Sequence, residues 1–137
     1  IRDRYKGAPS YLNGNEIHVS AISNLDDSFI ALGFPYATEE YKPMANHLVN
    51  TLYGNVAGLR LMGAAAVELC YIAAGRFEAR IEAFIGPWDI AAGTIILQNA
   101  GGMITDFKGG DSYSSGSQVL ASNGRIHRDL LNIIDNL

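Results

Sequence analysis

The chain has 137 residues, about the size of one domain, and 48% of them are hydrophobic and 18% charged, which excludes a disordered protein. Ten basic and fourteen acidic residues give a net charge of −4, so we expect no nucleic-acid partner, because such binders present a basic face. No apolar segment reaches the length of a membrane-spanning helix without a charge, so we also expect no membrane partner.

The first third of the chain predicts a hairpin, a buried strand and a helix. Asn13-Gly14 between two apolar segments predicts a β-hairpin, because both residues tolerate the positive φ of a tight turn. Residues 20–27 are polar and predict a loop, whereas residues 29–32 form an apolar run typical of a buried strand. A helix is expected from residue 38 onward, where apolar residues recur at helical spacing.

The rest of the chain predicts strands and helices in alternation, with short connections. Strands are expected within 55–62, 77–84, 103–105 and 119–121, and helices over 64–74, from Asp89 to Asn99 and after Gly124. Gly75 and Gly101-Gly102 are predicted to cap the first two of these helices at their C-termini. This order predicts an α/β fold, a layered sheet with helices packed on its faces.

The segment 86–93 carries the sharpest local signal for chemistry. Gly86-Pro87 ends a strand and Asp89 begins a helix, and Asp is a preferred N-cap because its carboxylate accepts hydrogen bonds from free backbone N–H groups. The same carboxylate can instead point outward as a ligand for Mg²⁺, and the local pattern leaves both interpretations open. Glu82 lies near the end of the preceding strand. It either shares a crevice with Asp89, where open α/β sheets bind ligands, or is a solvated surface charge.

Other reactive side chains lack a supporting pattern. His18, His47 and His127 are scattered, without the spacing of zinc ligands. The chain has neither a serine-hydrolase elbow nor a nucleotide-binding phosphate loop. The single cysteine, Cys70, excludes an internal disulfide and lies in an apolar helical run, which predicts a buried thiol in a reducing, cytoplasmic setting.

Four segments, in order and spacing, resemble the inositol monophosphatase family. Residues 88–93, Trp-Asp-Ile-Ala-Ala-Gly, followed by Ala100-Gly101-Gly102, are similar to the C-terminal signature of that family. Residues 7–14 resemble its hairpin with an Asn-Gly turn, residues 60–66 its Arg-x-x-Gly-Ser-Ala-Ala stretch, and residues 70–76 the helix end that follows. The resemblance covers essentially the whole chain, although members of the family are nearly twice as long.

The resemblance implies a fold and a domain organisation. The fold would be the C-terminal half of the αβαβα sandwich of the sugar phosphatases, with residues 1–137 as the C-terminal domain of an inositol monophosphatase-like phosphatase. The N-terminal half of the family carries most of the metal site, in a helix glutamate and an Asp-Pro-x-Asp-Gly-Thr segment, and no such segment occurs here. The isolated chain is therefore expected to be inactive, and the full-length protein to be a homodimer.

The resemblance also implies roles for individual residues. Asp89 matches a metal-ligating aspartate close to the hydroxyl groups of the substrate, so it would be both the catalytic and the metal-binding residue of this chain. Glu82 matches the acidic residue that binds the sugar or inositol hydroxyls, although Arg80-Ile81 replaces the aromatic pair often found before it. A backbone segment that lines the substrate pocket is matched by Gly63, Ala64 and Ala65. Ala64 stands where Ser or Thr is usual, so one side-chain contact is lost there.

The function implied by the resemblance is a Mg²⁺-dependent phosphomonoesterase acting on inositol monophosphate or a related sugar phosphate. In the family, Mg²⁺ ions activate a water that attacks phosphorus without a covalent enzyme intermediate. Asp89 would supply one anionic oxygen to the cations, while the helix behind it would direct its positive end at the phosphate. The alternatives are a relative acting on fructose 1,6-bisphosphate or a 3′-phosphorylated adenosine nucleotide, or a non-catalytic binding or assembly fragment.

Overall fold

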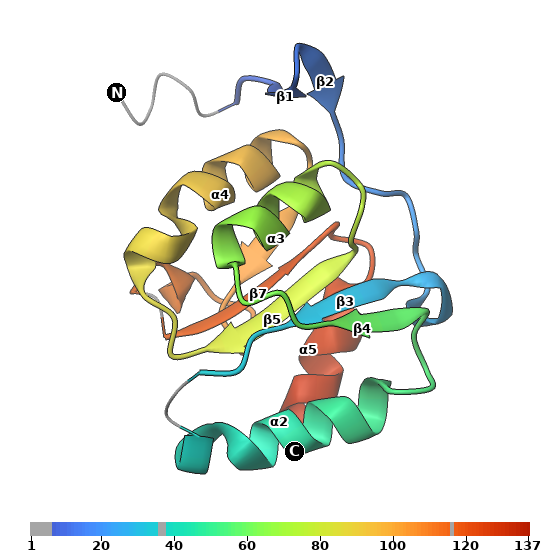
Figure 1. Ribbon diagram of the computed structural model, residues 1–137, viewed down its shortest axis with the longest axis vertical. Coiled ribbons are helices and arrows are strands. Elements are labelled where there is room, and N and C mark those ends of the chain that lie inside the picture. Colours follow the sequence, from blue (N-terminus) through green and yellow to red (C-terminus); the bar gives the residue numbers. More distant parts are fainter. Residues whose placement is uncertain (1–6, 36–37, 116) are drawn as a thin grey trace.

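A mixed sheet of five strands with helices on both faces forms the body of the structure (Figure 1). This computed structural model describes residues 7–35, 38–115 and 117–137. Its elements in chain order are β1 (Ser10–Leu12), β2 (Asn15–Ile17), η1 (Leu25–Asp27), β3 (Phe29–Leu32), α2 (Thr38–Leu52), β4 (Gly58–Arg60), α3 (Ala65–Ala73), β5 (Ala79–Ala83), α4 (Pro87–Asn99), β6 (Met103–Thr105), η2 (Ser112–Ser115), β7 (Gln118–Ser122) and α5 (His127–Asp135). The expected alternation of strands and helices is confirmed, and the short 3-10 turn η1 lies in the segment 20–27 that was expected to be a loop.

The strand order of the sheet is β4-β3-β5-β7-β6. β3 runs parallel to both of its neighbours, with Ile30 opposite Leu59 of β4 and Ala79 of β5. β7 runs antiparallel between β5 and β6. Because β4, β3 and β5 point in the same direction, their carboxyl ends meet at one edge of the sheet, where open α/β sheets bind ligands.

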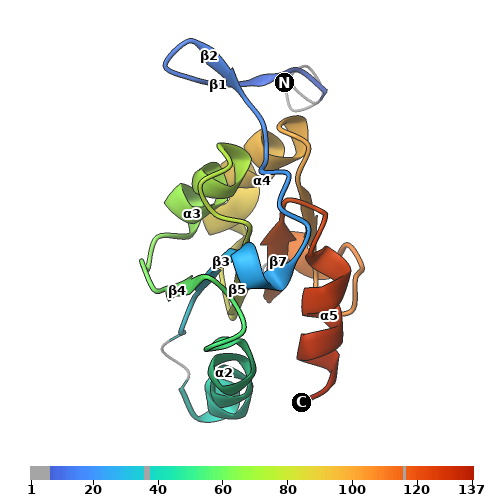
Figure 2. The ribbon, with the colours of Figure 1, turned by 90° about the vertical axis from the view of Figure 1, so that its right-hand side faces the viewer.

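Each face of the sheet is covered by two helices and has its own hydrophobic core, which makes three layers (Figure 2). The core on the side of α2 and α5 includes Ile30, Leu32, Leu48, Leu52, Ile81, Leu120, Leu130 and Ile134. The core on the side of α3 and α4 includes Leu69, Ile72, Ile90, Leu97, Val119 and Ala121. The predicted α/β layered fold is therefore confirmed. None of the helices in the described residues is long and apolar enough to cross a membrane.

Glycines fix the spacing and the ends of α3 and α4. A Cβ at Gly93 of α4 would lie 2.7 Å from Leu69 Cδ1 of α3, so only glycine allows the two helices to approach this closely. Gly75 and Gly101 adopt positive φ angles of 78° and 94° just after the two helices. The N–H of Gly102 donates to the carbonyl of Leu97 at 2.9 Å. The predicted C-caps are thus confirmed.

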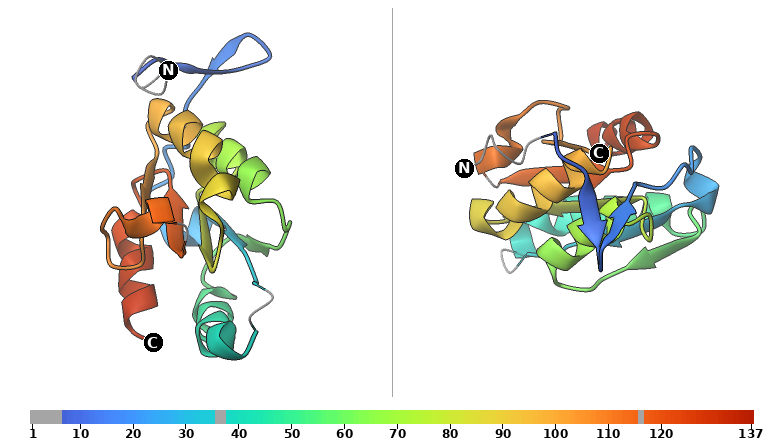
Figure 3. Two further views of the ribbon diagram at one scale, coloured as in Figure 1. Left: turned by 90° about the vertical axis from the view of Figure 1, so that its left-hand side faces the viewer. Right: turned by 90° about the horizontal axis from the view of Figure 1, so that it is seen from above.

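The β1–β2 hairpin forms a separate two-stranded sheet at the end of the molecule opposite the C-terminus (Figure 3). Asn13 and Gly14 adopt φ angles of 52° and 84°, which confirms the predicted tight turn. Ser10 of the hairpin donates a hydrogen bond from its hydroxyl to the carbonyl of Ile96 in α4, at 2.8 Å. The hairpin is therefore tied to the helices rather than to the central sheet.

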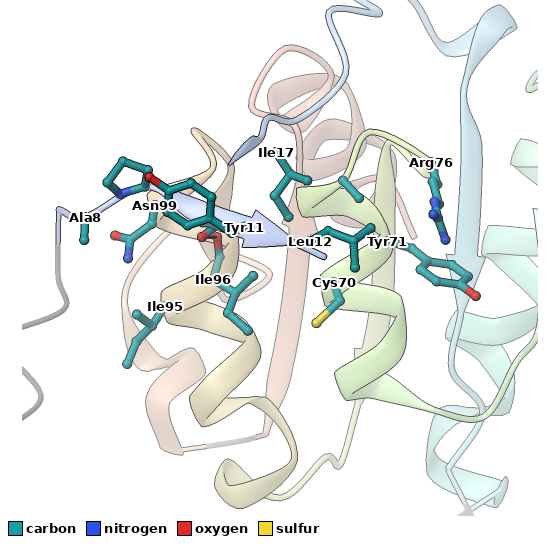
Figure 4. Close-up of a pocket in the computed structure, with 13 residues that line it drawn as sticks. Ala8, Tyr11, Leu12, Ile17, Cys70, Tyr71, Arg76, Ile95, Ile96 and Asn99 are labelled. Carbon is teal, nitrogen blue, oxygen red and sulfur yellow. Dashed lines mark hydrogen bonds between the residues drawn. The ribbon is translucent and has the colours of Figure 1, made fainter. Parts of the chain in front are cut away.

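A largely apolar groove of about 330 Å³ lies between the hairpin and the helices α3 and α4 (Figure 4). Cys70 and Tyr71 of α3 and Ile95 and Ile96 of α4 line it. Cys70 is only half-buried, so the prediction of a buried thiol is wrong. The groove beneath the hairpin opens this face of α3, which the helical pattern of the sequence does not reveal.

Candidate active site

A cleft of about 920 Å³ opens where the parallel strands β4, β3 and β5 end. Its walls are formed largely by the segments that follow these strands, namely residues 32–35, 61–68 and 84–86, together with Trp88 and Asp89. Beyond these strand ends, α2 follows β3 on one face of the sheet and α4 follows β5 on the other. The divergence of the two connections creates a crevice between β3 and β5.

The five residues expected to form the site all line this one cleft. They are Gly63, Ala64, Ala65, Glu82 and Asp89. Gly63 adopts a positive φ of 69° in the turn between β4 and α3, a conformation that favours glycine. The fold thus brings residues 63–65, at the start of α3, into one cleft with Glu82 of β5 and Asp89 of α4.

Asp89 is not the N-cap of α4. The helix begins two residues earlier, at Pro87, because proline is favoured at the first helical position, and Gly86 is the cap without a side-chain hydrogen bond. Asp89 is the third helical residue, and its backbone N–H donates to the carbonyl of Gly86 at 3.0 Å. The capping interpretation is therefore wrong. The carboxylate is exposed on the cleft and accepts no hydrogen bond from the residues that the structure describes.

Glu82 lies in the wall of the cleft, with its side chain against the backbone of Gly33 at the end of β3. A Cβ at Gly33 would lie 2.6 Å from Glu82 Cγ, so any other residue would displace the carboxylate. The N–H of Gly33 donates to the carbonyl of Ile81 at 2.9 Å, which extends the β3–β5 ladder to this point. Gly33 is a site residue that the sequence reasoning missed. The one feature of the sequence that could have identified it is a glycine directly after a buried strand.

Arg80 and Glu68 form a buried charged cluster with Glu82. Arg80 lies two residues before Glu82 on the same face of β5 and donates from Nη2 to Glu82 Oε2. Its Nε donates to Glu68 Oε2 of α3 at 2.8 Å. Both Arg80 and Glu68 are 1% exposed. In the sequence, Arg80 stands out only as a departure from the family pattern, and Glu68 not at all.

The aromatic side chains of Phe84 and Trp88 line the cleft, and Tyr41 contacts Phe84. Phe84 has a φ of 59°, which is unusual for a bulky residue. Its ring packs edge-on against the ring of Tyr41, with the two ring centroids 6.4 Å apart. Burial, reinforced by the charge of Glu82, raises the pKa of Tyr41 to about 12, so its hydroxyl stays protonated at neutral pH. Trp88 is 80% exposed and stacks over Gly86, where a Cβ would lie 2.6 Å from its Cζ2.

The comparison with known proteins decides the family. The sequence model of the inositol monophosphatase family matches residues 3–137. The chain belongs to this family. The Nus factor SuhB of Escherichia coli (strain K12) is 35% identical over 133 residues, which cover 96% of this chain and 50% of that protein. The chain thus spans about half the length of the curated relatives it matches.

Solved structures of inositol monophosphatases share the fold. The inositol monophosphatase of Anabaena (Nostoc) sp. PCC 7120 superposes with a TM-score of 0.85 at 32% identity, covering 96% of this chain and 54% of that one. The staphylococcal SaIMPase-II with bound inositol monophosphate gives a TM-score of 0.80 at 26% identity, covering 95% and 51%. The similarity extends over nearly the whole chain, as the resemblance predicted.

The acidic side chains of this chain fit a metal site of the family only in part. Within the described residues, no group of three or more His, Cys, Asp or Glu side chains could hold a metal ion. Glu82 already accepts from Arg80, whereas the carboxylate of Asp89 is open. Mg²⁺ binds several oxygen ligands. These residues could therefore supply one carboxylate ligand, Asp89, and the other ligands would have to come from elsewhere.

Proposed function

We propose that this chain is the substrate-recognising, C-terminal half of a Mg²⁺-dependent phosphomonoesterase whose substrate is inositol monophosphate or a related sugar phosphate. The observation that carries the proposal is the convergence on one cleft of Asp89, Glu82 and the N-termini of α3 and α4. Neither helix has a side-chain hydrogen bond at its N-cap. Their free N–H groups and positive dipole ends favour an anion such as a phosphate.

In this proposal, Asp89 holds a cation at the phosphate end of the cleft. When bound, Mg²⁺ supplies an activated water and neutralises phosphate oxygens. Asp89 sits in the first turn of α4, so its carboxylate and the helix N-terminus present opposite charges side by side. The carboxylate would attract the metal ion and the helix N-terminus would attract the phosphate ester. The ion and the ester would therefore lie next to each other.

The remaining residues orient the alcohol part of the substrate. Glu82 accepts a hydrogen bond from a substrate hydroxyl, for which a carboxylate oxygen is a strong acceptor. Gly63, Ala64 and Ala65 expose backbone instead of large side chains at the start of α3, which leaves room for a polyol ring. The related SaIMPase-II structure, which holds inositol monophosphate, supports this substrate class.

The organisation of the complete protein is part of the proposal. The other half would supply the remaining metal ligands, because the chain spans about half the length of its relatives and, among the described residues of the cleft, only the carboxylate of Asp89 accepts no hydrogen bond. We further propose a homodimer in the cytoplasm, as the resemblance to the family implies.

A substrate panel tests the proposed activity. The complete protein is assayed for phosphate release from inositol 1-phosphate, fructose 1,6-bisphosphate and a 3′-phosphorylated adenosine nucleotide, with Mg²⁺ and with excess chelator. We expect the highest kcat/KM for inositol 1-phosphate and none of this activity with chelator. A higher kcat/KM for either of the other substrates would favour the corresponding alternative, and activity that survives chelation would reject the metal mechanism.

A binding role is the second candidate, because the E. coli relative is named a Nus factor. In such a role, the acidic residues of the cleft would not take part in catalysis. The expectation of no nucleic-acid partner stays a prediction. A cellular function that survives Asp89→Asn would assign that function to binding. A function lost with this single carboxylate would assign it to catalysis.

A further inference from the structure

Arg80 is a buried arginine that contacts Glu82, the carboxylate that we propose binds the substrate. On β5, Ala79 and Ile81 face the apolar core beneath the sheet, whereas Arg80 and Glu82 face α3 and the cleft. Arg80 is 1% exposed, but the side chain of Glu82 is 19% exposed. The strand therefore presents a charge in the protein interior and a second charge, bonded to it, at the cleft surface.

Arg80 bridges two carboxylates that come from different elements. Its Nε donates to Glu68 Oε2 in α3 at 2.8 Å, and its Nη2 donates to Glu82 Oε2. Glu68 thereby fixes the guanidinium from the interior, and the guanidinium fixes Glu82 from behind. The second oxygen of Glu82, Oε1, has no hydrogen-bond partner in the described part of the chain, and Gly33 lies beside it.

Stability does not account for this cluster. Burying the carboxylate of Glu68 and the guanidinium of Arg80 carries a large desolvation penalty, which is offset only when all their hydrogen-bonding atoms are satisfied. Arg80 Nη1 and Glu68 Oε1 are buried without a partner among the described residues. Apolar side chains of similar volume commonly replace such clusters without loss of stability. The feature that the cluster does provide is a fixed orientation of Glu82.

We propose that Arg80, held by Glu68, is a positioning residue that aims Glu82 Oε1 at a hydroxyl group of the substrate. This inference rests on the proposed function, in which Glu82 binds that hydroxyl. A glutamate side chain has three rotatable bonds, and fixing them before the substrate arrives removes an entropy loss from the binding step. The substrates that benefit are phosphate esters of polyols, whereas an ester without neighbouring hydroxyls gains nothing.

The test compares two substrates in variants of the complete protein. Inositol 1-phosphate carries hydroxyls beside the ester, and p-nitrophenyl phosphate carries none. The double variant E68L/R80M removes both buried charges and keeps the apolar volume, so we expect it to fold. Its KM for inositol 1-phosphate should rise roughly 3- to 10-fold, the equivalent of one side chain that must be ordered on binding. Its kcat, and both constants for p-nitrophenyl phosphate, should change less than about twofold.

Three further variants make the result specific. E68Q keeps an acceptor for Arg80 Nε and should retain near-normal KM values. R80K keeps a buried charge but cannot bridge two carboxylates with a planar fork, so it should raise the KM for inositol 1-phosphate; it also serves if E68L/R80M does not fold. E82Q replaces the charged acceptor of the proposed contact with a neutral amide oxygen, which weakens that contact, and tests the proposed function separately.

The possible outcomes distinguish a failure of the proposed function from a failure of the positioning role of Arg80. If E82Q affects both substrates equally or neither, Glu82 does not bind a hydroxyl, and the proposed function fails together with this inference. If E82Q acts on inositol 1-phosphate alone while E68L/R80M and R80K leave its KM unchanged, Glu82 needs no positioning, and this inference is overturned. Equal losses on both substrates in E68L/R80M and R80K would assign the cluster to the fold and overturn it as well.

Discussion

Gly33 is the residue that leaves space for the carboxylate of Glu82. Its backbone needs no positive φ, so alanine would be tolerated by the chain itself, but a Cβ there would lie 2.6 Å from Glu82 Cγ. The neighbouring atoms belong to a side chain and not to backbone, so the side chain would move and the fold would remain. Gly33 thus controls the position of the carboxylate that we propose binds the substrate.

We therefore expect Gly33→Ala in the complete protein to lower kcat/KM for inositol 1-phosphate roughly tenfold or more, the effect of losing one charged hydrogen bond. The free energy of unfolding should change by less than about 1 kcal/mol, as measured by urea denaturation. Gly110→Ala, in an exposed loop outside the cleft, is the matched control and should leave kcat/KM unchanged. Normal activity in Gly33→Ala would show that the position of Glu82 is unimportant.

At the scale of elements, His127 joins the start of α5 to β6 and β7. Thr105 donates to the carbonyl of Asp106, so its hydroxyl accepts from His127 Nε2 at 2.8 Å. Ser122 then donates to the unprotonated Nδ1 at 2.7 Å. Burial lowers the pKa of His127 from 6.5 to about 4. The histidine is therefore neutral in the folded protein, and its role is structural.

This pKa shift predicts a dependence of stability on pH. Because the unfolded state binds the proton more tightly, the contribution of His127 is complete above pH 6.5 and is lost as the pH falls toward 4. When the pH is lowered from 7 to 5, the titration of His127 should reduce the free energy of unfolding by about 2 kcal/mol. Urea unfolding at several pH values measures this slope. His127→Gln should abolish that part of the slope, and an unchanged slope would assign it to other groups.

Elements that depend on local signals could be predicted from the sequence. The hairpin at Asn13-Gly14, the caps at Gly75 and Gly101 and the alternation of strands and helices all follow from short-range conformational preferences. The start of α4 was misplaced because Pro87 and Asp89 are both favoured near a helix start, and the sequence does not rank them.

The cleft was predicted only in part, for a physical reason. Asp89 and Glu82 stand out as carboxylates at strand and helix ends, and the fold brings them to one cleft. Gly33, Glu68 and Arg80 were missed because their roles depend on the β3–β5 register and on the packing of α3 over β5. Such contacts between distant elements leave no local pattern in the sequence.

At the scale of the whole molecule, the hairpin and the groove beneath it support our proposal that these residues function together with a second half of the protein. A two-stranded sheet is marginally stable by itself, and Tyr11 of this hairpin is 61% exposed. Among the described residues of the cleft, Asp89 is likewise the one carboxylate that accepts no hydrogen bond, whereas Mg²⁺ binds several oxygens. Both observations agree with a chain that spans about half the length of its relatives.

We expect the purified 137-residue chain to show no Mg²⁺-dependent hydrolysis of inositol 1-phosphate. Asp89 alone is too few ligands to hold Mg²⁺ usefully. Phosphate release is measured beside the complete protein at the same concentration, with circular dichroism as the control for folding. Hydrolysis by the 137-residue chain at a comparable rate would show that its own residues complete the metal site.

The most direct test of the proposed function is the rate of Mg²⁺-dependent phosphate release in Asp89→Asn, with Asp129→Asn as its matched control. Asp89 and Asp129 are both exposed and both the third residue of a helix, so each substitution removes a similar interaction with a helix dipole, about 0.3–1 kcal/mol of stability. Only Asp89 lines the cleft. We predict that Asp89→Asn loses most of its activity, whereas Asp129→Asn keeps it. A change of less than about threefold in Asp89→Asn would contradict the assignment of this carboxylate to the reaction.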